Sequence, residues 1–163
     1  MQKKALVVID IQNDITKQYK EILTSINQAI DWAAEHGIHV VYVRHYNLSA
    51  GTRTFKPDTI GAELVPEMKI VSDNIFIKTK GNALTSEAFA DFISRHDIND
   101  FIIAGADATA CVKSTCFNMR KANYTVTVLS DCVTSYDKKQ INETLQYYES
   151  KGCRLITVNE LSN

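Results

Sequence analysis

Apolar residues in this chain fall into short continuous runs separated by segments of helical periodicity. The runs predict strands near residues 5–9, 38–43, 75–78, 101–104, 124–129 and 153–158. The first run is apolar on both faces, which is typical of a parallel strand covered on both sides. From Tyr19 to Ala33 apolar residues recur at helical spacing, and they stop before Gly37, a residue type favoured just after a helix end.

Alternating strands and helices predict the fold class. Repeated strand–helix–strand order implies a parallel sheet with helices on both faces, because each crossover must be right-handed. We expect a three-layer α/β/α, Rossmann-like fold with a six-stranded, mostly parallel sheet, in a single domain over residues 1–163. The irregular segment 44–65 is long for a connection in a compact domain, so we expect it to be a lid or a partner-binding loop.

Composition narrows the class of partner. The 163 residues are 45% hydrophobic, which is enough for one core without covalent staples. A net charge of -1 argues against nucleic acid as the partner, because proteins that bind nucleic acid concentrate Lys and Arg. No apolar run reaches the roughly 20 residues that cross a bilayer, and the start reads as a strand rather than as a signal peptide. We therefore expect a cytoplasmic protein with a small-molecule partner and no membrane contact.

Three polar residues follow predicted strands. Asp10 follows the first strand, Lys78 the third, and Cys111 lies after the fourth, where a helix is expected from about Thr109. Carboxyl ends of parallel strands converge on one crevice, so these side chains should meet. A lone Cys or Asp at such a place is more often a packing or capping residue, but the coincidence of three favours a reaction site. The helix start and Lys78 are expected to favour the thiolate near neutral pH.

Two neighbouring positions stay open. Lys80 competes with Lys78 as the site lysine, although a strand-end residue points more predictably into the crevice than a loop residue does. Gln12 either orients the site or binds the backbone of its own loop.

These groups predict covalent chemistry at a carbonyl carbon. Asp10 can accept the proton of Cys111, and backbone N–H groups of Cys111 and Asp107 are candidates for an oxyanion hole. Collapse of the adduct would expel an amine and leave a thioester, which water activated by Asp10 would hydrolyse.

Several motifs carry a resemblance to a known family. They are VVIDIQND at 7–14, GAELVP at 61–66, Lys78, and GADATACVKST at 105–115. In this order and spacing the chain resembles the isochorismatase-like cysteine hydrolases over nearly its whole length. The resemblance implies Asp10 as proton acceptor, Lys78 as cation and Cys111 as nucleophile, on a three-layer α/β fold. It also implies a cis peptide between Ala106 and Asp107.

Departures from the family pattern limit the activity. Nicotinamidase-like members hold a metal with an Asp-x-His pair and a further His, whereas this chain has only His45 after the second strand. One imidazole cannot make such a site, so we predict no metal and no cofactor. His45 and Phe55 are then expected to line the substrate pocket. Isochorismatases proper lack the cysteine, so the resemblance favours cleavage of a C–N bond in a small amide, carbamoyl or ureide compound.

Two further expectations concern activity and assembly. The alternative to an enzyme is a catalytically inactive small-molecule-binding or assembly protein on the same fold. The resemblance implies a homo-oligomer, a dimer or larger, whose 44–65 segment covers its own pocket or a neighbour's. Tyr147, Tyr148 and residues 48–55 are expected to be partly exposed at an interface, or else to pack against their own helices.

Overall fold

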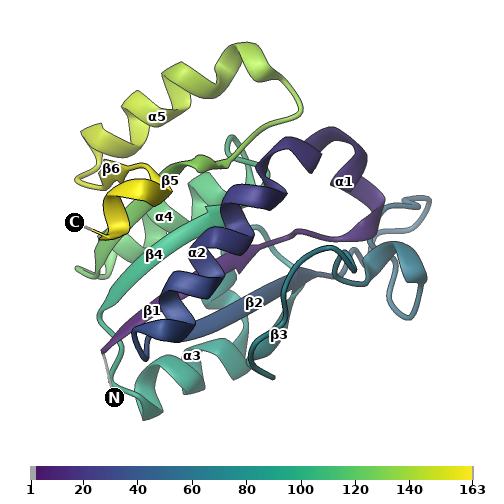
Figure 1. Ribbon diagram of the computed structural model, residues 1–163. Helices are drawn as coiled ribbons and strands as arrows, with labels where there is room; N and C mark the ends of the chain where they lie inside the picture. The colour runs from purple at the N-terminus through teal and green to yellow at the C-terminus, as the bar shows by residue number, and fades with distance from the viewer. Residues whose placement is uncertain (1–2, 163) are drawn as a thin grey trace.

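The computed structural model describes residues 3–162, and its six strands form one sheet with parallel pairing throughout. The strands are β1 Lys4–Ile9, β2 His39–His45, β3 Ile75–Lys78, β4 Asp100–Gly105, β5 Thr125–Val133 and β6 Arg154–Ile156. The α-helices are α1 Asn13–Tyr19, α2 Leu23–Glu35, α3 Glu87–Arg95, α4 Cys111–Lys121 and α5 Ile141–Ser150. The predicted α/β fold class is confirmed (Figure 1).

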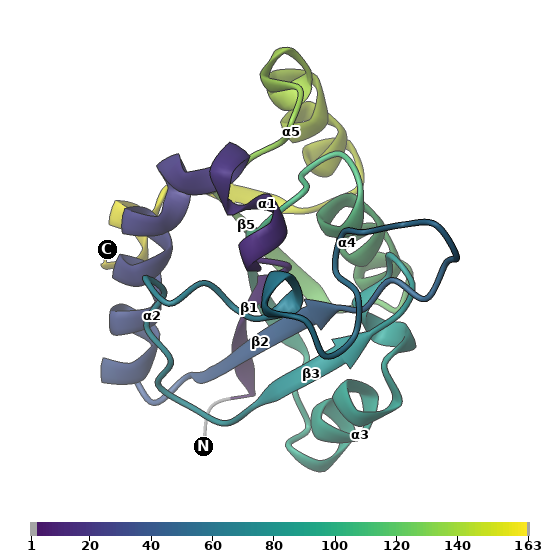
Figure 2. The same ribbon diagram turned by 90° about the vertical axis from the view of Figure 1, so that its right-hand side faces the viewer.

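Helices cover both faces of the sheet. Figure 2 shows α2 on one side of the strands and α3 and α4 on the other. Successive residues of β1 alternate between the two layers, because side chains of a strand point to opposite faces. Leu6 and Val8 pack in the core beneath α2, while Val7 and Ile9 pack in the core beneath α3 and α4. This arrangement explains why β1 is apolar at every position.

The strand order places a crevice beside β1. Along the sheet the order is β3-β2-β1-β4-β5-β6, so the chain leaves β1 toward one edge and later returns to β4 on its other side. Connections diverge at such a switch point, and ligands bind in the crevice outside the carboxyl ends of the strands. Asp10 follows β1 there, and Cys111 follows β4 across the crevice.

Gly105 makes the close approach of β1 and β4 possible. Its φ is +125°, and a Cβ at this position would lie 2.2 Å from the carbonyl oxygen of Ile9. Only glycine fits this contact, since any side chain would collide with the backbone of the neighbouring strand. The turn that leads to Cys111 therefore starts directly against the end of β1.

Several boundaries and exposures differ from expectation. The helix predicted from Tyr19 to Ala33 is interrupted by a 3-10 turn over Lys20–Ile22, after which α2 begins. Helix α4 begins at Cys111, slightly later than the expected start at about Thr109, because the Asp107 carboxylate accepts the Thr109 N–H and holds these residues in a turn. Tyr148 is 1% exposed and Phe55 7%, so neither side chain is an exposed interface residue.

The segment after β2 folds back against the end of β1. Asn13 N–H donates to the carbonyl of Glu63, and Val65 N–H donates to the carbonyl of Ile11. A short 3-10 turn, Ile60–Ala62, comes directly before these contacts. The segment thus borders the crevice that Asp10 enters. Within residues 3–162, no helix has the length and apolar character needed to cross a membrane.

Candidate active site

The ammonium group of Lys78 lies at the centre of a buried polar cluster. Its Nζ is 3.2 Å from Asp10 Oδ2, 2.8 Å from His45 Nδ1 and 3.3 Å from Cys111 Sγ. Lys78 is only 1% exposed, so these acceptors take the place of water around its charge. An ammonium has three N–H groups, and each of them has a partner here.

Strand ends bring these residues together. Lys78 is the last residue of β3 and pairs in register with His45, the last residue of β2. Asp10 adopts a φ of +57° just beyond β1, and its N–H donates to the carbonyl of Val43. Cys111 is the first residue of α4. Lys80 is exposed, so Lys78 is the lysine that contacts the other site groups.

Asp10 offers one carboxylate oxygen for a proton. Oδ2 accepts from Lys78, while Oδ1 is buried and has no nitrogen or oxygen partner among the described residues. Burial raises the pKa of this carboxyl, and the charge of Lys78 and the hydrogen bond with the Cys111 thiol act against that rise. A carboxylate with a raised pKa is a better proton acceptor than a solvated one.

The surroundings of Cys111 oppose the expected thiolate in the resting site. Burial, and next the charge of Asp10, raise the pKa of the thiol to about 12, although Lys78 lowers it. Desolvation and the carboxylate therefore outweigh the ammonium. At neutral pH the sulfur keeps its proton, and it can lose this proton only to a neighbouring base.

His45 is uncharged at neutral pH. Burial and the positive charge of Lys78 lower the pKa of its imidazole to about 4. Since Lys78 can only donate, Nδ1 of His45 must be the acceptor in the bond between them. The ring of Phe55 meets the His45 ring edge-on, with centroids 6.1 Å apart, so both residues predicted to line a pocket lie at the cluster.

Gln12 orients the site through backbone hydrogen bonds, and the backbone it binds belongs to His45 and Ala62 rather than to its own loop. Its side chain is fully buried and accepts from the His45 N–H at 2.8 Å. Its amide group donates to the carbonyls of His45 and Ala62 at 2.9 and 2.8 Å. Gln12 therefore holds backbone in place beside the cluster, and its contact with substrate stays a prediction.

The turn before Cys111 is held by side chains that the sequence did not reveal. The peptide bond between Ala106 and Asp107 is cis. The Asp107 carboxylate accepts from the Tyr19 hydroxyl at 2.8 Å and from the Tyr136 N–H at 3.0 Å. The buried Tyr148 hydroxyl donates to the carbonyl of Ala108. No local pattern signals these contacts, since Tyr19 and Asp107 are 88 positions apart.

A metal ion does not fit the cluster as it stands. Ligand atoms of Asp10, His45 and Cys111 lie within 4.8 Å of one another, which is a donor set that metals accept. Lys78 hydrogen-bonds to all three, so an ion would have to displace a buried ammonium. The absence of a metal from the reaction stays a prediction.

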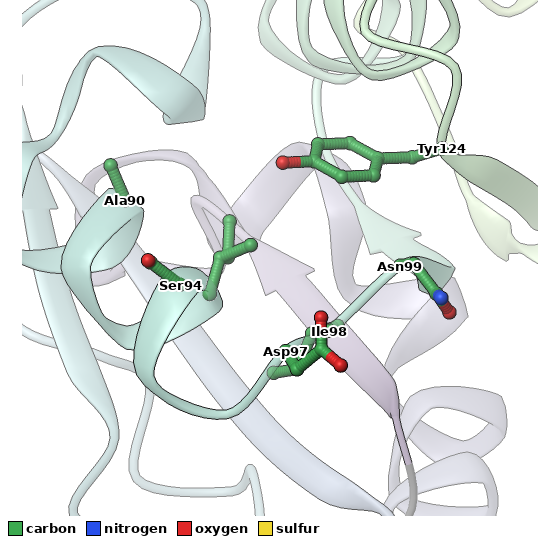
Figure 3. A pocket seen from close by; sticks show the side chains of 7 residues that line it. Ala90, Ser94, Asp97, Ile98, Asn99 and Tyr124 are labelled. Carbon is green, nitrogen blue, oxygen red and sulfur yellow. The ribbon is translucent and has the colours of Figure 1, made fainter.

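A separate pocket lies at the opposite end of the sheet. It has a volume of about 260 Å³ and lies between the end of α3 and Tyr124, near the starts of β4 and β5 (Figure 3). Cys111 follows the carboxyl end of β4, so this pocket does not include the cluster around Lys78.

Comparisons with known proteins place the chain in a family. It is 25% identical over 184 residues to a probable inactive nicotinamidase of Arabidopsis thaliana, covering 97% of this chain and 94% of that protein. The structure of an isochorismatase family protein from Desulfovibrio vulgaris superposes with a TM-score of 0.90 at 18% identity, covering 99% and 97% of the two chains. That of N-carbamoylsarcosine amidase from Thermoplasma acidophilum superposes with a TM-score of 0.83 at 22% identity, covering 96% and 97%.

The family itself is shown by a match along the sequence. The isochorismatase domain model matches residues 4–160, a range that includes every residue of the cluster around Lys78. The chain therefore belongs to the isochorismatase family of hydrolases.

Proposed function

We propose that the protein is a cysteine-dependent hydrolase that cleaves a C–N bond of a small amide, carbamoyl or ureide compound. The meeting of Asp10, Lys78 and Cys111 in one buried cluster is the observation that carries this proposal. A structural neighbour named as an amidase supports the same reaction class.

Attack begins from the neutral thiol. Cys111 Sγ bonds to the carbonyl carbon as its proton passes to Asp10 Oδ1, and the carbonyl π electrons move to oxygen. Backbone N–H groups of Asp107 and Cys111 would bind this oxyanion. As the first N–H of α4, that of Cys111 has no partner within the helix. In the described part of the chain, the Asp107 N–H makes no backbone hydrogen bond.

Collapse and hydrolysis restore the enzyme. The C–N bond breaks as the leaving nitrogen takes the proton from Asp10, and a thioester remains on Cys111. Water then attacks the thioester carbon while Asp10 accepts one of its protons. The C–S bond breaks, and the sulfur regains that proton. Lys78 keeps the carboxylate and the developing sulfur anion compensated throughout.

A catalytically inactive binding protein is the second candidate. The raised pKa of the Cys111 thiol favours it, since a thiol with a pKa of about 12 is a poor nucleophile without efficient proton transfer. The relative named as a probable inactive nicotinamidase supports the same view. In this case the crevice would bind a small molecule without cleaving it.

Turnover and covalent trapping separate the two candidates. The intact protein is screened for ammonia release from small amides and ureides, and Cys111→Ala serves as the matched variant. We expect turnover that Cys111→Ala abolishes without loss of folding, because Cys111 is partly exposed. Mass spectrometry should find an acyl adduct on Cys111 and none on the buried Cys116. Activity that survives in Cys111→Ala would show that Cys111 is not the nucleophile. Binding of a small molecule without turnover would favour the second candidate.

A further inference from the structure

Lys78 has no N–H group left for a substrate. Its three hydrogen bonds go to Asp10, His45 and Cys111. The cation at the centre of the site can therefore stabilise charge but cannot recognise a ligand while these bonds hold. Recognition beside the sulfur must come from another group.

His45 has one free donor because Lys78 uses its other ring nitrogen. Nδ1 accepts from Lys78 Nζ at 2.8 Å, so the single ring proton of a neutral His45 sits on Nε2. Among the described residues, Nε2 has no hydrogen-bond partner. It does not belong to the fully buried polar atoms that lack a partner, so it is not sealed off by the protein. This N–H group is therefore open to a ligand.

Two independent contacts fix the direction of this donor. Gln12 binds both the N–H and the carbonyl of His45, which anchors its backbone. The edge of the Phe55 ring lies beside the imidazole, with centroids 6.1 Å apart. With Lys78 holding Nδ1 as well, the ring cannot turn without losing a partly buried hydrogen bond. Gln12 is thus a positioning residue for His45.

We propose that His45 determines substrate specificity by donating its Nε2–H to a second hydrogen-bond acceptor of the substrate, beside the carbonyl that Cys111 attacks. The inference rests on the proposed function and names its substrate class: amides or ureides with another carbonyl oxygen close to the scissile one. Simple aliphatic amides lack this acceptor and would be poorer substrates.

Distances limit where the acceptor can lie. One ring nitrogen of His45 lies within 4.8 Å of the Cys111 sulfur, which places the imidazole beside the attacking atom. A reacting carbon lies about 3 to 3.5 Å from the sulfur, and an N–H···O bond spans about 2.9 Å. These lengths together fit an acceptor one or two bonds from the attacked carbon.

Nuclear magnetic resonance of the wild-type protein tests the proton position without any substrate. Long-range nitrogen–proton correlations distinguish the two neutral tautomers and the charged ring, and the His45 signals are assigned by their loss in His45→Asn. We expect the Nε2–H tautomer at pH 7. A proton on Nδ1, or a doubly protonated ring, would overturn the proposal.

Alkylation of Cys111 tests the donor. The attacked carbon of iodoacetamide lies one bond from an amide carbonyl, whereas allyl iodide has no acceptor. We compare the ratio of the two alkylation rates, iodoacetamide over allyl iodide. A change in thiol ionisation alters both rates equally, because both reagents react with the same sulfur, so it does not alter the ratio. Loss of one hydrogen bond should lower this ratio about fivefold in His45→Asn. His45→Gln, whose amide nitrogen can replace Nε2–H, should keep it within about twofold.

The variants separate this inference from the proposed function. Circular dichroism checks that both variants fold, and Cys111→Ala should show no labelling at this position. An equal ratio in wild type and His45→Asn would overturn the role of His45, as would an equal fall in both His45 variants. Neither readout needs amide hydrolysis, so the proposed hydrolase activity can fail while the His45 assignment stands.

Discussion

Lys78 carries a positive charge into a place that water does not reach. A buried charge is tolerated only where hydrogen bonds and opposite charge compensate for its lost hydration. Asp10 supplies the charge, while His45 and Cys111 complete the set of acceptors. Removing the ammonium would therefore disturb each of its partners at once.

Replacement of Lys78 by Met should make Cys111 less reactive. Lys78 lowers the pKa of the Cys111 thiol and opposes the rise in the pKa of Asp10, so both groups should ionise at higher pH in Lys78→Met. We expect iodoacetamide labelling of Cys111 at fixed pH to slow by about an order of magnitude. Breaking the buried pair should also cost about 3–5 kcal/mol of stability.

Lys80→Met is the matched control for this substitution. Lys80 is exposed in the loop after β3, so its replacement should change neither the labelling rate nor the midpoint of urea unfolding. Equal labelling in the two variants and the wild type would contradict the role given to Lys78.

His45 should make the protein less stable in weak acid. Its folded pKa of about 4 lies below the unfolded value of about 6.5. As pH falls through this interval, the unfolded chain takes up a proton that the native imidazole refuses, so the free energy of unfolding decreases. Urea unfolding at pH 7 and pH 5 should show that the free energy of unfolding falls less in His45→Gln than in the wild type. Other groups titrate in both proteins, so both should lose some stability. An equal fall in the free energy of unfolding would exclude a contribution from His45.

The junction of β1 and β4 depends on the lack of a side chain at Gly105. In Gly105→Ala the new methyl group would meet the backbone of Ile9 at 2.2 Å, at a φ unfavourable for alanine. We expect a loss of more than about 2 kcal/mol in the free energy of unfolding. In Gly81→Ala the nearest atom would lie at 3.8 Å, so that control should stay within about 0.5 kcal/mol. Similar unfolding midpoints for the two variants would contradict the close strand approach.

Asp14 contacts the segment after β2, which lies beside the crevice and contains Phe55 and Gly61. Its carboxylate accepts the Phe55 N–H at 2.6 Å, and a Cβ on Gly61 would lie 2.1 Å from the same carboxylate. Gly61→Ala should therefore push Asp14 away and release Phe55 from the His45 ring. We expect faster hydrogen exchange at the Phe55 amide and, with an active substrate, a rise in KM that exceeds the fall in kcat. Gly81→Ala is again the control. Unchanged hydrogen exchange at the Phe55 amide in Gly61→Ala would contradict this role of Asp14.

At the level of the molecule, one sheet edge leaves apolar side chains in contact with solvent. Ile75 and Ile77 lie on the edge strand β3 and are 37% and 42% exposed, and Ile70 and Val71 lie just before it. Exposed apolar patches mark interaction sites, and an unpaired edge can add another strand. We expect a dimer or larger homo-oligomer by light scattering, and Ile77→Lys should weaken it. A monomer at all accessible concentrations would contradict this expectation.

Local patterns were sufficient to predict the strands and the three functional residues at or beyond their carboxyl ends. A buried parallel strand must be apolar along its whole length, and parallel strands must end at one edge, so Asp10, Lys78 and Cys111 could be placed together in advance. The same reasoning could not pair Gln12 with His45 or Tyr148 with Ala108, which are separated by 33 and 40 positions. Such hydrogen bonds depend on how connecting segments pack.

The linear chain thus decided the fold class and which functional groups enter the crevice, because hydrophobic periodicity and strand direction are properties of short segments. Packing alone decided the ionisation of those groups. The thiol pKa of Cys111 is the difference between the cost of burial, the repulsion of Asp10 and the attraction of Lys78, and each depends on distances of a few ångströms. The open donor of His45 likewise follows from a single contact with Lys78 that no spacing of residues announces.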